Sequence, residues 1–269
     1  MTVSELKEKA RQIRLETIEM VAKATSGHPG GSLSATDLLV ALYYSKMRLY
    51  EDPHDERRDR FVLSKGHANP PLYAILADKG YVDKDELNYL RRLHHPFQGH
   101  PESNKCPGID CSTGSLGQGI SVATGMALGF KLRKDDNRVY AMVGDGELDE
   151  GLCWEAFMAA ANYKLDNLTV IVDRNMLQLD GNTEEIMAHG DLKAKFEAFG
   201  FLTDVIDGHD FEEILAALDR CEEGKPHCII AKTVKGKGVS YMENNVDWHG
   251  SVPKGEQLET ALRELGGKQ

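Results

Sequence analysis

The sequence predicts an α/β fold in which helices flank both faces of a parallel β-sheet. Two observations support this prediction: five short runs rich in β-branched and apolar residues are spread along the chain, and helical patterns separate most of them. Strands that alternate with helices form parallel pairs, and the connecting helices then cover both sheet faces. The expected strands are FVLS (61–64), VYAMV (139–143), LTVIV (168–172), LTDVI (202–206) and CIIAK (228–232).

Two helices are expected before the first strand. Residues 4–25 repeat apolar side chains at helical spacing, and the loop SGHPGGSL (26–33) ends this pattern. We expect a second helix from Ser34 to about Met47, because Ser34 and Asp37 have the spacing of a helix-capping box.

The remaining helices and two long loops complete the expected order. The segments 93–116 and 233–254 resist assignment, and loops of more than about 12–15 residues are often functional. Both border a strand end or a helix start, where open α/β sheets bind ligands. We interpret residues 1–269 as one domain. Its helices are expected at about 117–132, 150–163, 191–199, 210–222 and, as a closing helix, 254–266.

The composition argues against several function classes. The net charge is −11 and no basic stripe occurs, so we expect no nucleic-acid partner. No apolar run approaches the roughly 18 residues of a membrane span, and the charged N-terminus is unlike a signal peptide. Five cysteines at irregular spacing predict reduced thiols and a cytoplasmic location rather than a disulfide framework.

An acidic turn follows the second expected strand. Gly144-Asp145-Gly146 lies between a strand and a helix, where phosphate loops occur, but this turn carries no Lys, Ser or Thr. Asn175 follows the next strand, and a right-handed crossover brings both strand ends together. A carboxylate and an amide oxygen suit Mg²⁺ or Ca²⁺. The acid is therefore expected to bind a cation, which in turn binds a phosphate.

A structural explanation of the same turn remains open. Asp after Gly is common in turns, and the acids Glu147, Asp149 and Glu150 also suit a helix N-terminus. The placement of Asn175 favours the metal site.

Sequence context alone does not choose among the ten histidines. Imidazole suits proton transfer near neutral pH. Six histidines lie in loops beside glycine, and any single one is more often structural; the six are His28, His67, His100, His189, His209 and His249.

Several segments resemble a known family. Gly144-Asp145-Gly146 with Asn175 resembles the thiamine diphosphate fingerprint, and the surrounding segments are similar to transketolase. The resemblance runs from about residue 8 to 255 and implies the pyrophosphate-binding (PP) domain of the thiamine-diphosphate-binding fold. The segments are SGHPGGSLSATDLL (26–39), LSKGHANPPLYAIL (63–76), GHPE (99–102), STGSLGQGISVATGMALG (112–129), GDGELDEGLCWEA (144–156), DRNMLQLDG (173–181), AKTVKGKG (231–238) and WHG (248–250).

The resemblance implies a metal site and a cofactor site. Asp145, Asn175 and the backbone carbonyl of Leu177 match the metal ligands, so that Asn175 also belongs to the cofactor site. The backbone of Gly146 and the side chains matching His67 and His249 contact the diphosphate in the family. The segment that includes Gly114 and Leu116 matches the part that lies against the cofactor rings.

The resemblance also implies substrate contacts and an interface. His28, His100 and His249 match the histidines that face the substrate, and are expected to be catalytic. Glu150 and Glu155 match acids that join two active sites across a dimer interface.

The family's full chain has two further domains, which this sequence lacks. A pyrimidine-binding domain carries the glutamate that activates the cofactor, and most residues that grip a sugar phosphate lie outside the PP domain. The resemblance therefore implies the N-terminal subunit of a split transketolase, with a C-terminal partner subunit in a heterotetramer. The closing helix favours a natural subunit over a truncated chain.

The implied reaction transfers a two-carbon ketol unit from a ketose phosphate to an aldose phosphate, in the pentose phosphate pathway, with thiamine diphosphate and Mg²⁺ or Ca²⁺. The chain is expected to be inactive without its partner. Two alternatives remain: a related enzyme such as a deoxyxylulose-phosphate synthase, or a non-catalytic module that binds thiamine diphosphate. Retention of His28 and His100 favours an enzyme over a binding module.

Overall fold

The computed structural model describes residues 1–267, which contain one five-stranded parallel sheet. The strand order is β1-β2-β3-β5-β4. The predicted parallel sheet and its strands are confirmed. The strands are β1 (Arg60–Leu63), β2 (Val139–Gly144), β3 (Leu168–Arg174), β4 (Leu202–Asp207) and β5 (His227–Lys232).

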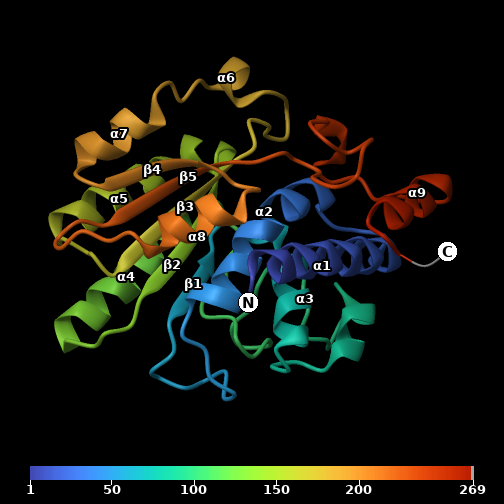
Figure 1. Ribbon diagram of the computed structural model, residues 1–269, viewed down its shortest axis with the longest axis horizontal. Helices are drawn as coiled ribbons and strands as arrows, with labels where there is room; N and C mark the ends of the chain where they lie inside the picture. The colour runs from blue at the N-terminus through green and yellow to red at the C-terminus, as the bar shows by residue number, and fades with distance from the viewer. Residues whose placement is uncertain (268–269) are drawn as a thin grey trace.

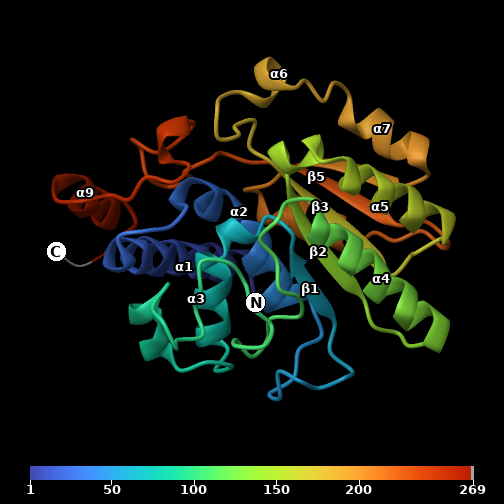
Figure 2. The ribbon, with the colours of Figure 1, turned by 180° about the vertical axis from the view of Figure 1, so that it is seen from behind.

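Helices cover both faces of the sheet, as Figures 1 and 2 show from opposite sides. The first face packs against α1 (Val3–Ala24), α2 (Pro29–Ala41), α3 (Pro70–Asp78) and α8 (Phe211–Asp219). The second face packs against α4 (Gln118–Arg133), α5 (Gly151–Asn162) and α7 (Leu192–Phe199). Two further helices, α6 (Thr183–Ile186) and α9 (Glu256–Glu264), lie in the segments beyond the sheet.

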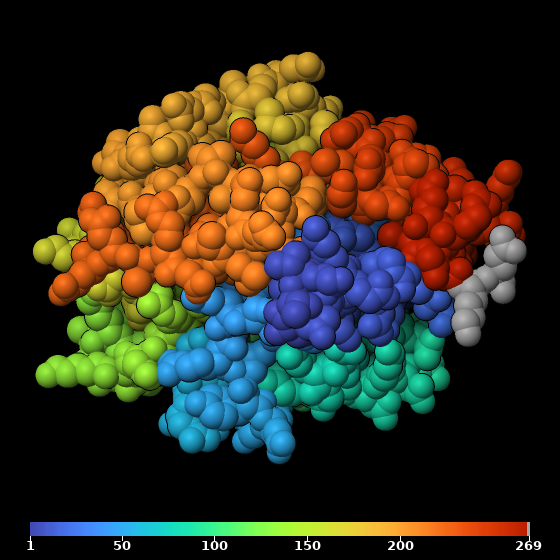
Figure 3. Space-filling view, in the orientation of Figure 1, coloured from blue at the N-terminus to red at the C-terminus, as the bar shows by residue number. Residues whose placement is uncertain are grey.

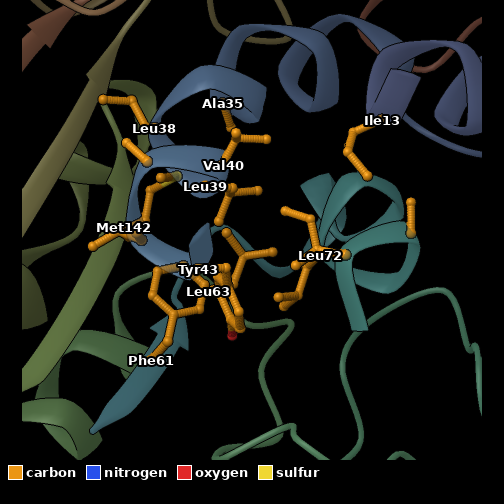
Figure 4. Close-up of a cluster of buried hydrophobic side chains, with 14 of the residues drawn as sticks. Ile13, Ala35, Leu38, Leu39, Val40, Tyr43, Phe61, Leu63, Leu72 and Met142 are labelled. Carbon is orange, nitrogen blue, oxygen red and sulfur yellow. The ribbon is translucent and has the colours of Figure 1, made fainter. Parts of the chain in front are cut away.

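Two apolar cores, one on each face, explain why the strand sequences are almost continuously apolar. Neighbouring residues of a strand point to opposite faces, so a strand covered on both sides buries every side chain. Phe61, Leu63 and Met142 face α2, where they meet Leu38 and Leu39 (Figure 4). Val62, Ala141 and Val143 face the other core, with α4 and α5.

Helix α2 begins at Pro29, so the expectation of a start at Ser34 is wrong. Proline is well suited to the first turn of a helix, and the whole of α2 is buried. Its Gly30 is required for space, because a Cβ there would lie 2.7 Å from the backbone oxygen of Trp248. Ser34, instead of capping, donates a hydrogen bond to Asp173 from inside the helix.

The carboxyl ends of the strands form one edge of the sheet, and the polar residues that follow them meet there. Ser64 follows β1, Asp145 follows β2, Asn175 follows β3 and Thr233 follows β5. In the space-filling view, α1 lies between the segment that contains α3 and the C-terminal segment that ends in α9 (Figure 3). Within residues 1–267, none of the helices combines the length and the apolar character that a bilayer crossing requires.

Candidate active site

A cavity of about 300 Å³ lies at the carboxyl edge of the sheet. Larger hollows of about 410 and 700 Å³ lie beside β4 and beside α9, but they are open and contain none of the predicted site residues. The smaller cavity contains all of those residues except His100, whose imidazole lies within 3.4 Å of the place that a Cβ on Gly114 would take. The predicted residues that line it are His28, His67, Gly114, Leu116, Asp145, Gly146, Asn175, Leu177 and His249.

The predicted metal ligands come together at the ends of β2 and β3. Asp145 is 1% exposed, and its two oxygens accept hydrogen bonds from the backbone N–H groups of Gly146 (2.9 Å) and Met176 (2.6 Å). The side-chain oxygen of Asn175 accepts from the N–H of Leu177 at 3.1 Å. The acidic turn and the loop after β3 are therefore tied to each other.

The donor set fits a hard cation. Burial, with Asp173 as a second cause, raises the pKa of Asp145 to about 6, so the cationic neighbour Lys65 does not fully compensate this carboxylate. The carbonyl oxygen of Leu177 accepts a hydrogen bond from the ammonium group of Lys235 at 3.0 Å, which shows that this oxygen already faces a cationic group. Within residues 1–267 no group of three His, Cys, Asp or Glu side chains could hold a metal, so the ligands would be oxygens of mixed type, with phosphate oxygens completing them.

A buried hydrogen-bond network behind the metal site was missed by sequence reasoning. Asp173 is fully buried and accepts hydrogen bonds from Ser34 (2.6 Å), Lys65 and Thr233. Although burial opposes it, Lys65 and these hydrogen bonds hold the pKa of Asp173 below its usual value. Lys65 also donates to the carbonyl of Gly31 at 3.0 Å. The network joins α2 to three strand ends and so fixes the walls of the cavity.

Glu147 explains one of the extra acids after the turn. It is 2% exposed and accepts hydrogen bonds from the backbone of Gly117 (2.9 Å) and Gly144 (3.0 Å) and from the hydroxyl of Ser64. Its role is thus to hold the segment before α4 beside the acidic turn.

Three of the predicted histidines form a cluster. The ring centroids of His28, His67 and His249 lie 5.1 to 5.5 Å apart. Burial is the main cause that lowers the pKa of His28 to about 4, of His249 to about 3 and of His67 well below its usual value, and neighbouring cations add to it. All three rings are therefore neutral near pH 7 in the chain.

The other loop histidines bond away from the cavity. His209 lies 2.7 Å from an oxygen of Asp37 and accepts from the N–H of Val234 at 2.8 Å, so it joins the start of α8 to the α2 side. His189 lies 2.9 Å from an oxygen of Asp149. These partners separate them from the cluster, a distinction that sequence context did not provide.

Two lysines bring positive charge to the cavity and were not predicted as site residues. Lys65 and Lys235 both line it. Lys235 lies 2.8 Å from Nδ1 of His249, and burial, with Lys65 as a second cause, lowers its pKa to about 8. Two ammonium groups beside a metal site suit a ligand with several phosphate oxygens. Both stand in the segments SKGH and TVKGKG, where only resemblance to a family sets them apart from surface lysines.

Comparison with known proteins shows which family has this arrangement. Residues 6–269 match the family described as transketolase, thiamine diphosphate binding domain. One of the two kinds of subunit of apulose-4-phosphate transketolase, from Phocaeicola vulgatus, is 42% identical over 268 residues, which cover 98% of this chain and 95% of that protein. A 6-deoxy-6-sulfo-D-fructose transketolase subunit of a Clostridium species is 42% identical over 97% of this chain and 96% of that protein.

A solved structure confirms the predicted thiamine-diphosphate-binding fold. The crystal structure of transketolase from Campylobacter jejuni superposes with a TM-score of 0.93 at 35% identity. It covers 100% of this chain, but the chain spans only 44% of that protein. The chain thus has the length of the subunit relatives and less than half the length of the single-chain enzyme. By sequence and by fold, the chain belongs to the transketolase family and corresponds to its thiamine diphosphate-binding N-terminal domain.

Proposed function

We propose that this chain is the N-terminal subunit of a split transketolase that transfers a two-carbon ketol unit from a ketose phosphate to an aldose phosphate. The observation that carries the proposal is the cavity at the sheet edge, which unites the oxygen ligands, two lysines and the histidine cluster. The subunit relatives match this chain over nearly their whole length and are named as transketolase subunits, which supports the same conclusion.

Each part of the cavity has a role toward the cofactor. Asp145, Asn175 and the carbonyl of Leu177 would hold Mg²⁺, or Ca²⁺ in its place, and the metal would hold the diphosphate. The backbone of Gly146 approaches the diphosphate closely, and His67 and Lys235 add hydrogen bonds. The segment with Gly114 and Leu116 would form the wall against the rings. When bound, thiamine diphosphate supplies the nucleophilic carbon and the electron sink of the reaction.

The histidines act on the substrate. His28 and His249 are neutral at pH 7 and line the cavity, so they present imidazole groups to the substrate's oxygens without a permanent charge. His100 lies beside Gly114 at the cavity's border and would contact the substrate as it enters. These side chains orient the sugar and exchange hydrogen bonds with its hydroxyl and carbonyl oxygens.

The second half of the active site would come from a partner. The exposed residues Val122 on α4 and Leu152 and Met158 on α5 leave apolar surface beside Glu150 and Glu155, the acids expected at an interface. We propose a C-terminal subunit with the pyrimidine-binding domain as the partner, two copies of each chain in a heterotetramer, and no activity in this chain alone. The five thiols, none of them in a disulfide among residues 1–267, suit the cytoplasm.

The preferred sugars follow from the partner as much as from this chain. The named relatives act on different anionic sugars, an apulose 4-phosphate and a 6-deoxy-6-sulfofructose. We propose sugar phosphates as the substrate class and the pentose phosphate pathway as the setting. A non-catalytic binding module is the rival function, and the two His residues at the substrate side argue against it.

Assembly of the enzyme from separate subunits tests the proposal. The chain is mixed with a pyrimidine-domain subunit that copurifies with it, and ketol transfer is assayed with thiamine diphosphate and Mg²⁺. Transfer by the mixture is expected. A mixture that binds the cofactor but transfers no ketol unit to any sugar phosphate would favour the binding module.

A further inference from the structure

Arg91 contacts the histidine cluster from outside the cavity. Its Nη2 lies 3.4 Å from Nδ1 of His28, and its Nη1 donates a hydrogen bond to the hydroxyl of Ser26 at 2.7 Å. Among residues 1–267 no carboxylate pairs with this half-buried guanidinium. Its interactions are therefore directed at the loop that leads into α2, of which His28 is the last residue before the helix.

The contact determines where His28 carries its proton. A guanidinium has only donors and does not deprotonate in proteins, so Nδ1 of His28 must be the acceptor. A neutral imidazole has one N–H, which then lies on Nε2. Within residues 1–267, Nε2 of His28 has no hydrogen-bond partner, and it lies 3.9 Å from the place that a Cβ on Gly250 would take. The absence of a side chain at Gly250 leaves this N–H open to a ligand.

We propose that Arg91 is a positioning residue that fixes the tautomer of His28, so that His28 presents Nε2–H to the substrate as a hydrogen-bond donor and not as a base. The role of His28 toward a sugar rests on the proposed function, whereas the tautomer itself does not. His28 then polarises an oxygen of the substrate without giving up its proton, because the product of such a transfer, an imidazolate, is far too basic to form near neutral pH.

The surroundings of Arg91 and His28 agree with this assignment. Arg91 has a left-handed backbone, with φ of 62°, which costs about 1–3 kcal/mol in a residue other than glycine and often marks a functional site. Its guanidinium lies against Gly99, where a Cβ would come within 3.2 Å of Nε. The groups that face His28 are Arg91, His67, His100, Lys235 and His249, all of them cationic or neutral.

Nitrogen NMR of the imidazole rings measures the tautomer directly. The full chain is labelled with ¹⁵N-histidine, and the His28 signals are identified by their loss in His28→Gln. In the wild-type chain near neutral pH we expect one neutral tautomer, with the proton on Nε2. A wild-type His28 with its proton on Nδ1, or one that is doubly protonated, would overturn the proposal without the need for any further variant.

Two substitutions of Arg91 test the cause. Arg91→Met keeps an unbranched stem but removes the donors, so a mixture of both tautomers is expected. Arg91→Lys keeps a donor and should restore the single Nε2–H form. An unchanged tautomer in a folded Arg91→Met chain would show that Arg91 does not set it. If Arg91→Met does not fold, Arg91→Lys decides together with the wild type, because loss of the single tautomer in Arg91→Lys would contradict the proposal.

Kinetics with the partner subunit connect the tautomer to the reaction. Arg91→Met should lower kcat by about 10- to 100-fold, on the scale seen when a group that orients a ligand is lost, and Arg91→Lys should recover most of it. An unchanged kcat in Arg91→Met with a mixed tautomer would refute the role in catalysis. The expected tautomer in an assembly that transfers no ketol unit would instead defeat the proposed function and leave the assignment of the proton intact.

Discussion

Asp145 is buried beside a second carboxylate, Asp173, and this arrangement costs stability in the cofactor-free chain. The pKa of Asp145 is raised from 3.8 to about 6, by burial first and by Asp173 second. A group whose pKa is higher in the folded than in the unfolded state stabilises the fold at low pH. That contribution is full below the unfolded-state value and is lost as pH rises through about 6.

Asp145→Asn should therefore stabilise the cofactor-free chain and disable its metal site. Near neutral pH the free energy of unfolding should rise by about 1–3 kcal/mol, since each pKa unit corresponds to about 1.4 kcal/mol. Urea unfolding at two pH values measures this, and the difference from wild type should shrink toward pH 4. Calorimetry should show loss of Mg²⁺-dependent thiamine diphosphate binding in both Asp145→Asn and Asp145→Ala. Unchanged cofactor affinity would contradict the metal assignment.

The four site histidines should divide into two functions in the assembled enzyme. His67→Ala should weaken cofactor binding, because we place His67 at the diphosphate. His28→Ala and His100→Ala should lower kcat or donor affinity, on the order of 10²-fold for a lost hydrogen bond to the reacting oxygen, and should change cofactor affinity less. Calorimetry and steady-state kinetics separate the two effects. Equal losses of cofactor affinity in all three variants would refute the division.

At the residue scale, the sequence predicted those side chains whose position follows from strand order. Asp145 and Asn175 each follow a strand, and the parallel pairing of β2 with β3 brings them together. Lys65 and Lys235 gave no such signal, because a buried lysine looks like a surface lysine in the sequence. The choice of His28 over His209 came from the family resemblance, since both stand beside glycine in loops.

At the scale of elements, close contact between α4 and β1 positions one wall of the cavity. A Cβ on Gly119 would lie 2.7 Å from Cα of Ser64, so the helix touches the strand end through backbone. The hydroxyl of Ser64 accepts from the N–H of Ile120 at 3.1 Å and donates to Glu147. The strand end, the helix start and the acidic turn are thus held as one unit.

Substitution of two glycines in the same helix tests this contact. Gly119→Ala should lower the free energy of unfolding by about 1–3 kcal/mol, the usual cost of overpacking, because Ser64 must move. Gly125→Ala is the matched control. No atom lies within 4 Å of its added Cβ, so it should raise stability by up to about 1 kcal/mol through helix propensity. Denaturant unfolding of the isolated chain measures both, and equal stability of the two variants would contradict the close contact.

The strands were predictable because burial on both faces leaves a continuous apolar run, as in Val139 to Val143. The start of α2 was not, because Pro29-Gly30-Gly31 has the composition of a loop, and only tertiary packing against Trp248 and Lys235 explains a helix there. Helix α3 received no prediction, and it begins with Pro70-Pro71 and is buried over most of its length, so it has no polar face to reveal a helical period.

At the scale of the whole molecule, the chain has one half of a cofactor cleft. The cavity is formed by this chain's metal ligands, lysines and histidines, and the family's pyrimidine-binding domain has no counterpart in it. Cofactor binding by the chain alone should be weak, because one wall of the cleft is missing.

Thermal unfolding should reveal the partner's contribution. Thiamine diphosphate with Mg²⁺ should raise the Tm of the mixed subunits far more than that of either one by itself. A ligand at 100 times its Kd stabilises the folded state by about 2.7 kcal/mol. Asp145→Ala in the mixture is the control and should abolish the increase. An equal shift for the chain alone would show that the cofactor needs no partner.

Transfer of an isotopically labelled ketol unit tests the central claim most directly. A ketose phosphate carrying ¹³C at C1 and C2 is incubated with an aldose phosphate, thiamine diphosphate and Mg²⁺, and NMR follows the label. We predict that both labelled carbons move together to the aldose when this chain and its pyrimidine-domain partner are mixed. Neither chain by itself, nor a mixture with Asp145→Ala, should move them. Transfer by this chain alone, or no transfer by a mixed assembly that binds the cofactor, would contradict the account.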